Sequence, residues 1–215
     1  MCDIAMKTTW ESFERNYWKY YLKLEKEFLE IIDFVELVPE NYKVYSIKLM
    51  QLLLSLGSEV DAVLRDICQM ADTERTSIAD YARIIVEKYP SLRLQRVCVF
   101  RSNLIISPFQ EWDLNCPSQS LPFWNAYNTI KHHRATGYPQ ASLEAVANAV
   151  AALFILNMYR LNEIYMSSEA CQQNIPNEES TLLYLENWDA RYRFSVLKSH
   201  YRIVDDDEKK IVLPS

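Results

Sequence analysis

A short run of side chains that can bind anions or move protons stands in the second half of this 215-residue sequence. It extends from Asn128 to Arg134 and contains an amide, a lysine, an arginine and two of the three histidines of the chain. Imidazole gains and loses a proton near neutral pH, and lysine and arginine stabilise negative charge. The run is therefore a candidate site for proton transfer beside an anionic group.

A single predicted helix positions this run. We expect Ser120 to cap the helix and Pro122 to stand in its first turn, where the missing N–H of proline is tolerated. Gly137 and Pro139 are expected to end the helix. The same helix then presents every residue from Asn128 to Arg134.

The side chains of this helix sort onto three faces, because successive residues lie about 100° apart. Asn125, Asn128 and His132 share a polar face. The other two faces carry Phe123, Ala126, Ile130 and His133, and Trp124, Tyr127, Lys131 and Arg134. His133 shares the apolar face, so we expect it to turn inward and favour His132 as the exposed imidazole. Cations near a helix C-terminus also complement its dipole, which leaves a structural interpretation open.

Helical periodicity in the rest of the chain predicts a mainly α fold. One apolar stripe begins near Thr8, where a capping-box pattern stands, and ends before Pro39. Another runs over residues 42–70, with a kink or break expected at Gly57-Ser58. A last long helix is expected from Ser142 to about Met166.

A shorter helix and a β-hairpin are expected between these long helices. Ser77, with Asp80 three residues later, is a capping-box pattern that predicts a helix ending before Pro90. β-branched, partly alternating residues on both sides of Ser102-Asn103 predict a hairpin over residues 92–106.

We therefore divide the chain into an up-and-down helical bundle at residues 1–166, with the hairpin inserted, and a C-terminal extension at residues 167–215. The extension is expected to be irregular or to form short strands, and to pack on the bundle.

Composition argues against several classes of protein. There are only two glycines, and neither G-x-G-x-x-G nor G-x-x-x-x-G-K-[ST] occurs, so no motif in the sequence predicts a nucleotide-binding loop. The net charge of −6 disfavours a generally basic nucleic-acid-coating protein but allows a local basic patch. Five cysteines without C-x-x-C spacing predict reduced thiols, and hence a cytoplasmic protein. There is no apolar run long enough to predict a membrane span.

Metal binding has weak support in the sequence. Three histidines with no His-x-x-Glu-His spacing make a poor ligand set, so no metal and no cofactor is expected. Glu59, Asp61 and Asp66 are close together in the second helix and form an alternative carboxylate site. We favour a solvated acidic face, with Asp61 paired to Arg65, over that site.

The order of these elements resembles the HEPN superfamily of prokaryotic helical bundles over residues 8–166. The segment Trp124–His132, with its Asn-x-x-Lys-His-x-Arg pattern ending at Arg134, is similar to the polar helix of that family. The resemblance implies a homodimer that brings two copies of this helix into one cleft. It also implies either a metal-independent endoribonuclease of a phage-defence or toxin–antitoxin system, or a non-catalytic module that binds RNA or a partner protein such as a nucleotidyltransferase.

The catalytic signature of the family is an arginine followed four to six residues later by a histidine, and no arginine precedes His132 on this helix. An Asn–Lys–His variant assigns the catalytic roles to three residues. His132 accepts a proton from the RNA 2′-hydroxyl, Lys131 steadies phosphate charge and Asn128 orients the phosphate or the imidazole. The residues expected to bind the substrate are Arg134, Asn125 and Tyr127. A bundle with a structural polar helix and a small-molecule pocket elsewhere is a further alternative.

Overall fold

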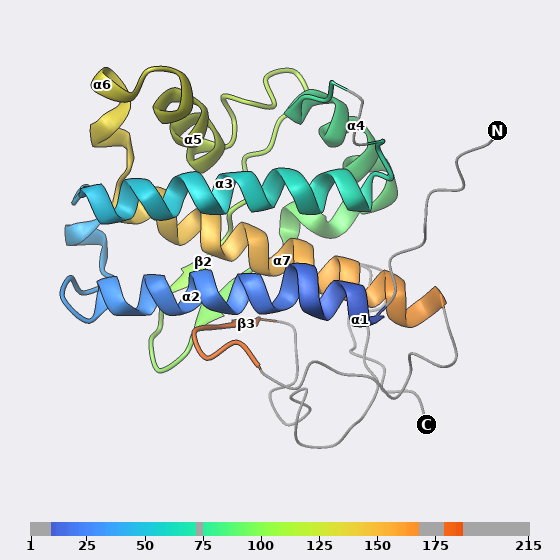
Figure 1. The fold of residues 1–215 in the computed structure, drawn as a ribbon, viewed down its shortest axis with the longest axis horizontal. Helices are drawn as coiled ribbons and strands as arrows, with labels where there is room; N and C mark the ends of the chain where they lie inside the picture. Colours follow the sequence, from blue (N-terminus) through green and yellow to red (C-terminus); the bar gives the residue numbers. More distant parts are fainter. Residues whose placement is uncertain (1–9, 72–74, 168–178, 187–215) are drawn as a thin grey trace.

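The computed structural model describes residues 10–71, 75–167 and 179–186 as long helices packed side by side, with one small antiparallel sheet (Figure 1). The prediction of a mainly α fold with a small β insertion is confirmed. The long helices are α2 (Lys19–Ile32), α3 (Ile47–Ile67) and α7 (Leu143–Ser167). α2 runs opposite to α3 and α7, and a β-bridge between Tyr45 and Ser142 joins the starts of the last two (Figure 1).

The first helical segment contains a change of period that the sequence pattern did not predict. α1 (Trp10–Phe13) continues into the π-helical turn η1 (Glu14–Trp18) and then into α2. A π-turn inserts an extra residue relative to the α-helical repeat. Trp18 is consequently fully buried, whereas Tyr17, which continues the α-helical repeat from Phe13, is only half-buried. Thr8, the expected cap, lies outside the described residues.

α3 follows the short 3-10 turn η2 (Pro39–Asn41) and begins where Ser46 accepts a hydrogen bond from the backbone N–H of Leu49 at 3.1 Å. The predicted kink or break at Gly57-Ser58 is wrong, because α3 runs straight and without interruption to Ile67 (Figure 1). A Cβ atom on Gly57 would lie 2.3 Å from the ring of Tyr127. The glycine is therefore explained by close packing between two helices rather than by a break. The prediction that Tyr45 begins the apolar stripe of this helix is wrong, because Tyr45 precedes α3 and is 49% exposed. The other members of the predicted stripe are buried: Leu49, Leu52, Leu56, Val60, Val63 and Ile67.

The shorter elements also follow the sequence with one correction. α4 (Ile78–Lys88) has the predicted capping box, in which both the side chain and the backbone N–H of Ser77 hydrogen-bond to Asp80 and lower the pKa of that carboxyl. Pro90–Leu94 form a 3-10 turn, η3, so the hairpin begins later than predicted.

The hairpin consists of β1 (Val97–Val99) and β2 (Ile105–Ile106), which pair antiparallel with Val97 opposite Ile106. A third strand, β3 (Leu183–Leu185), pairs with the other edge of β1, so the sheet order is β2-β1-β3. The expectation of a short strand in the C-terminal extension is confirmed for these residues. Residues 168–178 and 187–215 of the extension lie outside the described part.

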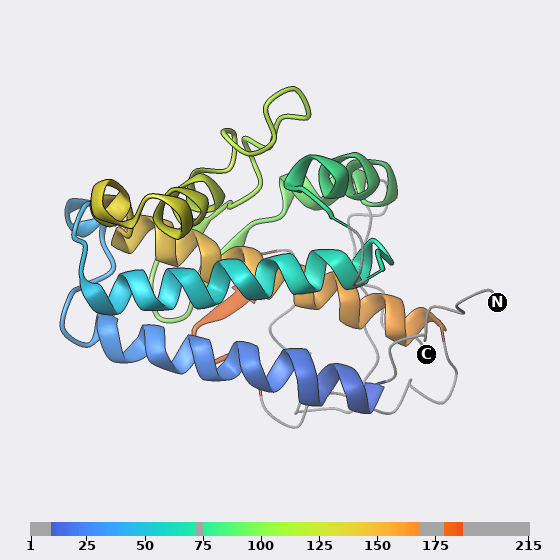
Figure 2. The ribbon, with the colours of Figure 1, turned by 45° about the horizontal axis from the view of Figure 1, so that its top comes forward.

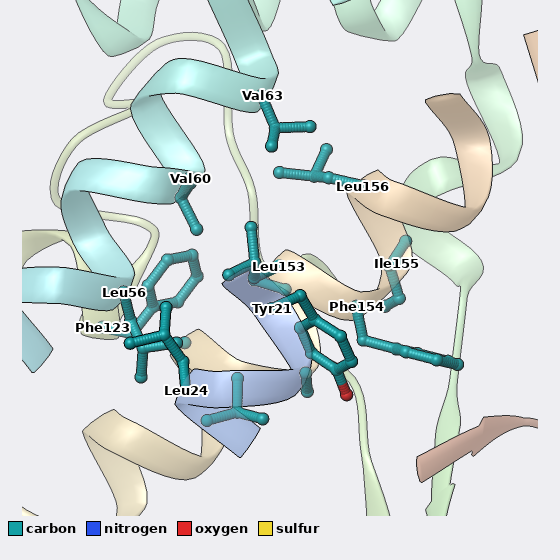
Figure 3. Close-up of a cluster of buried hydrophobic side chains, with 14 of the residues drawn as sticks. Tyr21, Leu24, Leu56, Val60, Val63, Phe123, Leu153, Phe154, Ile155 and Leu156 are labelled. Carbon is teal, nitrogen blue, oxygen red and sulfur yellow. The ribbon is translucent and has the colours of Figure 1, made fainter. Parts of the chain in front are cut away.

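α7 is the central helix of the core. It is buried on nearly all sides, and its Leu153–Leu156 segment meets side chains from α2, α3 and α5 (Pro122–His132) (Figure 3). Leu143–Ile164 is long and apolar enough to cross a membrane, but 89% of its most apolar window is buried inside the protein. Within the described residues it is the only helix that passes this test, and its burial is that of a core helix.

The Gly57–Tyr127 contact generates a prediction for stability. We expect Gly57→Ala to destabilise the fold by about 2 kcal/mol, because overpacking of the ring outweighs the better helix propensity of alanine. The free energy of unfolding in urea measures the effect.

The control is the same substitution in a Tyr127→Ala background. There the added methyl group meets no ring, so Gly57→Ala should stabilise by up to about 1 kcal/mol. A stabilising effect in both backgrounds would show that the contact does not constrain position 57.

Candidate functional site

The helix that carries the candidate residues lies across α3 and α7 (Figures 1 and 2). Leu121 occupies its N-cap position without a side-chain cap, so the expectation that Ser120 caps the helix is wrong. The Ser120 hydroxyl instead accepts a hydrogen bond from the Asp113 backbone N–H at 2.9 Å and closes the preceding loop. The residues of α5 that face the core are Phe123, Trp124, Ala126, Tyr127 and Ile130.

The polar face predicted for this helix points outward. Asn125 and His132 are exposed and Asn128 is half-buried. Among the described residues, no hydrogen-bond or ion-pair partner is found for these three side chains. Their amide and imidazole groups therefore remain available to a ligand along one side of α5.

Lys131 is held by the residue one turn before it. Its Nζ atom donates to the Tyr127 hydroxyl at 3.3 Å and lies 5.3 Å from the centre of the Tyr127 ring. Tyr127 itself is only 5% exposed and packs on Gly57. The predicted substrate-binding residue Tyr127 therefore presents little surface to a ligand, and its hydroxyl contacts the Lys131 ammonium group.

α5 ends earlier than the sequence indicated. His133 leaves the helical conformation at φ −136° and ψ 54°, and the separate short helix α6 (Arg134–Gly137) follows, with the 3-10 turn η4 (Tyr138–Gln140) after it. The expectation that His133 turns inward is wrong, because the end of the helix rotates this side chain to the surface. Arg134 is exposed on α6 rather than on the candidate helix, and Gly137 and Pro139 do not end α5. Lys131, His132, His133 and Arg134 are nevertheless all exposed at one junction.

An apolar hollow lies beside this junction, and the sequence reasoning missed it. Its volume is about 280 Å³, and its lining comes from the start of α3 and from α6 and η4: Ile47, Met50, Arg134, Ala135 and Tyr138. Ile47 is 63% exposed. Tyr45 is 49% exposed and meets the Tyr138 ring edge to face, with the ring centroids 5.2 Å apart. The signal in the sequence was Ile47, an apolar residue outside the buried stripe of its helix.

A second cluster of charged residues joins α3, α4 and α7. Arg160 donates to Asp66 at 2.5 Å and to Glu163 at 2.8 Å. Lys88 pairs with Glu163 and donates to the Ile67 carbonyl oxygen at 3.0 Å. These groups balance one another and fix helix ends, so we interpret the cluster as structural. Nowhere in the described ranges do three His, Cys, Asp or Glu side chains form a group that could hold a metal ion, so the alternative carboxylate site that included Asp66 is not formed.

The described cysteines are Cys68, Cys98 and Cys116, and all three are free thiols. Burial raises the pKa of Cys68 to about 11, so this thiol is protonated at neutral pH. Its thiolate, which would be the nucleophile, is then scarcely populated.

A buried carboxylate links α2 to the C-terminal strand. Glu25 is 3% exposed and accepts hydrogen bonds from the Tyr21 hydroxyl at 2.5 Å and from the Thr181 backbone N–H at 2.8 Å. The Ser180 hydroxyl also donates to it. Burial, with a further contribution from Glu25, raises the pKa of Tyr21 well above its ordinary value, so this hydroxyl keeps its proton. We call these hydrogen bonds of Glu25 with Tyr21, Ser180 and Thr181 the latch. The latch fixes the residues that lead into β3.

A larger hollow, of about 860 Å³, lies beside the latch. Its walls come from the end of α2 and the loop after it, the tip of the hairpin and residues 179–182. Among the described features, this hollow best fits the alternative of a small-molecule pocket away from the polar helix. Arg101, at its rim, has φ 59° and is exposed.

Comparison of the chain with protein-family models, with curated proteins and with solved structures found no match. The fold and the site define this chain as a mainly α protein with an exposed basic junction between α5 and α6.

The latch generates a prediction for stability. We expect Glu25→Gln to destabilise the fold by about 2 kcal/mol, because hydrogen bonds to a buried charged acceptor are lost or reversed. Urea unfolding measures the loss, and faster amide hydrogen exchange in β1 reports the loosening of β3.

The matched control is Glu27→Gln. Glu27 lies on the same helix, but its only ion pair among the described residues is with the exposed Lys48, at 3.9 Å. A surface pair of this kind contributes less than about 1 kcal/mol. Equal losses in the two variants would contradict the latch.

Proposed function

We propose that this protein binds RNA at the junction of α5 and α6 and that His132 accepts a proton from a ribose 2′-hydroxyl there. The observation that carries the proposal is the exposure of four consecutive side chains, Lys131 to Arg134, in a chain of net charge −6. No ion pair between these side chains and an acid occurs among the described residues. A local positive patch that its own protein does not neutralise favours a polyanionic ligand.

Each residue at the junction has a distinct part in the proposal. Lys131 and Arg134 bind phosphate oxygens, and Tyr127 keeps the Lys131 ammonium group in place. The amides of Asn125 and Asn128 lie along the same side of the helix and donate to the sugar–phosphate backbone. The His132 imidazole supplies the group that accepts a proton.

The chemistry needs no metal ion. The 2′-hydroxyl attacks the adjacent phosphorus, the bond to the 5′-oxygen breaks, and a cyclic phosphate forms. His132 takes the proton of the attacking hydroxyl. His133, which the end of α5 exposes, provides a second imidazole that can protonate the leaving 5′-oxygen. Lys131 and Arg134 stabilise the charge on the phosphate in the transition state.

The resemblance to the HEPN superfamily supports the proposal in two respects. The described fold is mainly helical, and its polar helix lies outward on the bundle. We extend the proposal accordingly to a homodimer and to a role in phage defence or in a toxin–antitoxin pair. The alternative is a non-catalytic module that binds a partner protein. The exposed Ile47 and Tyr45 beside the junction favour that alternative, since exposed apolar groups are typical of protein interfaces.

The RNA proposal predicts a salt-dependent affinity. We expect Lys131→Met with Arg134→Met to weaken the binding of a labelled RNA and to reduce the slope of log affinity against log salt by about two, one unit for each lost phosphate contact. Fluorescence anisotropy over a salt series measures both quantities.

Lys23→Met with Lys26→Met is the charge-matched control, because both lysines are exposed on α2, on the other side of α3 from the junction (Figure 2). Equal losses of affinity in the two double variants would mean that binding follows net charge and not this junction.

The catalytic part of the proposal has its own test. In EDTA, the wild-type protein should cleave RNA and leave 2′,3′-cyclic phosphate ends. His132→Gln should reduce the rate by 10²-fold or more, as about 10²- to 10⁴-fold is typical for a lost general base. A deoxynucleotide at the cleaved position should block the reaction, because the nucleophile is then missing. If His132→Gln cleaves as fast as the wild type, His132 is not the base.

A further inference from the structure

We infer that the hollow beside the junction is a binding site for one unpaired nucleobase of the bound strand. The inference rests on the proposed RNA binding and adds a site for the base to the sites for the phosphates. The hollow is small, about 280 Å³, and its walls are mainly apolar. One planar aromatic ring system matches such a space, whereas a folded protein surface would contact much more of the molecule.

The walls come from two elements that the fold holds together. Ile47 and Met50 belong to the first turn of α3, and Ala135 and Tyr138 belong to α6 and η4. The backbone N–H of Leu143 donates to the Val44 carbonyl oxygen at 2.8 Å and fixes the chain around η4 to the chain before α3. The hollow is therefore preformed.

Aromatic and charged groups meet at this hollow. Tyr138 lines it, and Tyr45 supports the Tyr138 ring from the side at an interplanar angle of 87°. Arg134 also lines it and belongs to the basic run from Lys131. A base stacked on a tyrosine with its phosphate near arginine is the usual arrangement in single-stranded nucleic acid binding.

This arrangement selects an unpaired base. In an RNA duplex both faces of each base are stacked and its edges are paired, so no base can enter a side pocket without being extruded. A single strand, a bulge or a loop offers a base at little energetic cost. The occupant to which we commit is thus an unpaired base of an RNA strand, with its flanking phosphates on Arg134 and Lys131.

The experiment compares two pairs of RNAs, and the charge is nearly equal within each pair. Anisotropy measures the affinity of the full-length protein for a labelled single-stranded RNA, for the same strand with abasic positions, for a perfect duplex and for a duplex with one bulged nucleotide. We expect the abasic strand to bind about tenfold more weakly than the intact strand, and the perfect duplex to bind about tenfold more weakly than the duplex with one bulged nucleotide.

Variants then place the effect at the hollow. Tyr138→Leu should lower the affinity for the intact strand about tenfold and leave that for the abasic strand unchanged, whereas Tyr138→Phe should keep both affinities. Tyr45→Ala should produce a smaller loss of the same kind. Tyr20→Ala is the matched control, because Tyr20 is also an exposed tyrosine, at 37%, and lies in the first turn of α2.

The outcomes separate this inference from the proposed function. Equal binding of intact and abasic strands overturns the base site and leaves phosphate binding at the junction in place. The absence of any RNA binding at low salt overturns both. If Tyr138→Leu and Ile47→Ala abolish the binding of a copurifying protein while RNA affinity is unchanged, the hollow is a protein contact and the inference is wrong. A variant that does not fold, as judged by circular dichroism, is replaced by Ala135→Leu, which fills the hollow from an exposed position and should give the same loss.

Discussion

The contact between the Tyr127 ring and Gly57 determines how the candidate helix lies on the bundle. A side chain larger than hydrogen at position 57 would overlap the ring, so α3 and α5 approach each other only because a glycine stands there. That approach turns Trp124 and Tyr127 inward and leaves Asn125 and His132 outside. The hydroxyl of the same side chain accepts a hydrogen bond from Lys131. One packing contact therefore sets both the burial of α5 and the position of a cation at the surface.

This contact buries no charge. The buried ring of Tyr127 is uncharged, and the charged ammonium group of Lys131 is exposed to solvent. The ring of Tyr127 removes apolar area from water, while its hydroxyl reaches the edge of the protein and meets the Lys131 ammonium group. A hydrogen bond of this kind contributes about 0.5–1.5 kcal/mol, too little to drive folding but enough to restrict a flexible side chain. The fold thereby orders a charge without burying it, and an ordered cation loses less entropy when it binds phosphate.

Sequence reasoning succeeded for two features that depend on residues close in the sequence. The apolar stripe of α3 and the capping box of Ser77 and Asp80 depend on residues within a few turns, and both are present as predicted. One of its failures arose from a residue distant in the sequence, and another from an early helix end. From the sequence, Gly57 predicts a helix break, but the structure shows that it allows Tyr127 of another helix to pack on α3. His133 lies on the apolar face of a continuous helix, but α5 ends at this residue and exposes it. No glycine or proline marks that stop in the sequence, so a periodic pattern continued across it.

The early end of α5 also explains why the basic run can serve as a site. On one uninterrupted helix, four consecutive residues point in four directions and only part of them can meet one ligand. The end of α5 at His133 and the new direction of α6 leave His132, His133 and Arg134 all exposed, with Arg134 on the wall of an apolar hollow. The phosphate-binding groups and the apolar surface then lie next to each other. A ligand that has charge and an apolar ring in adjacent parts uses both, and a nucleotide is such a ligand.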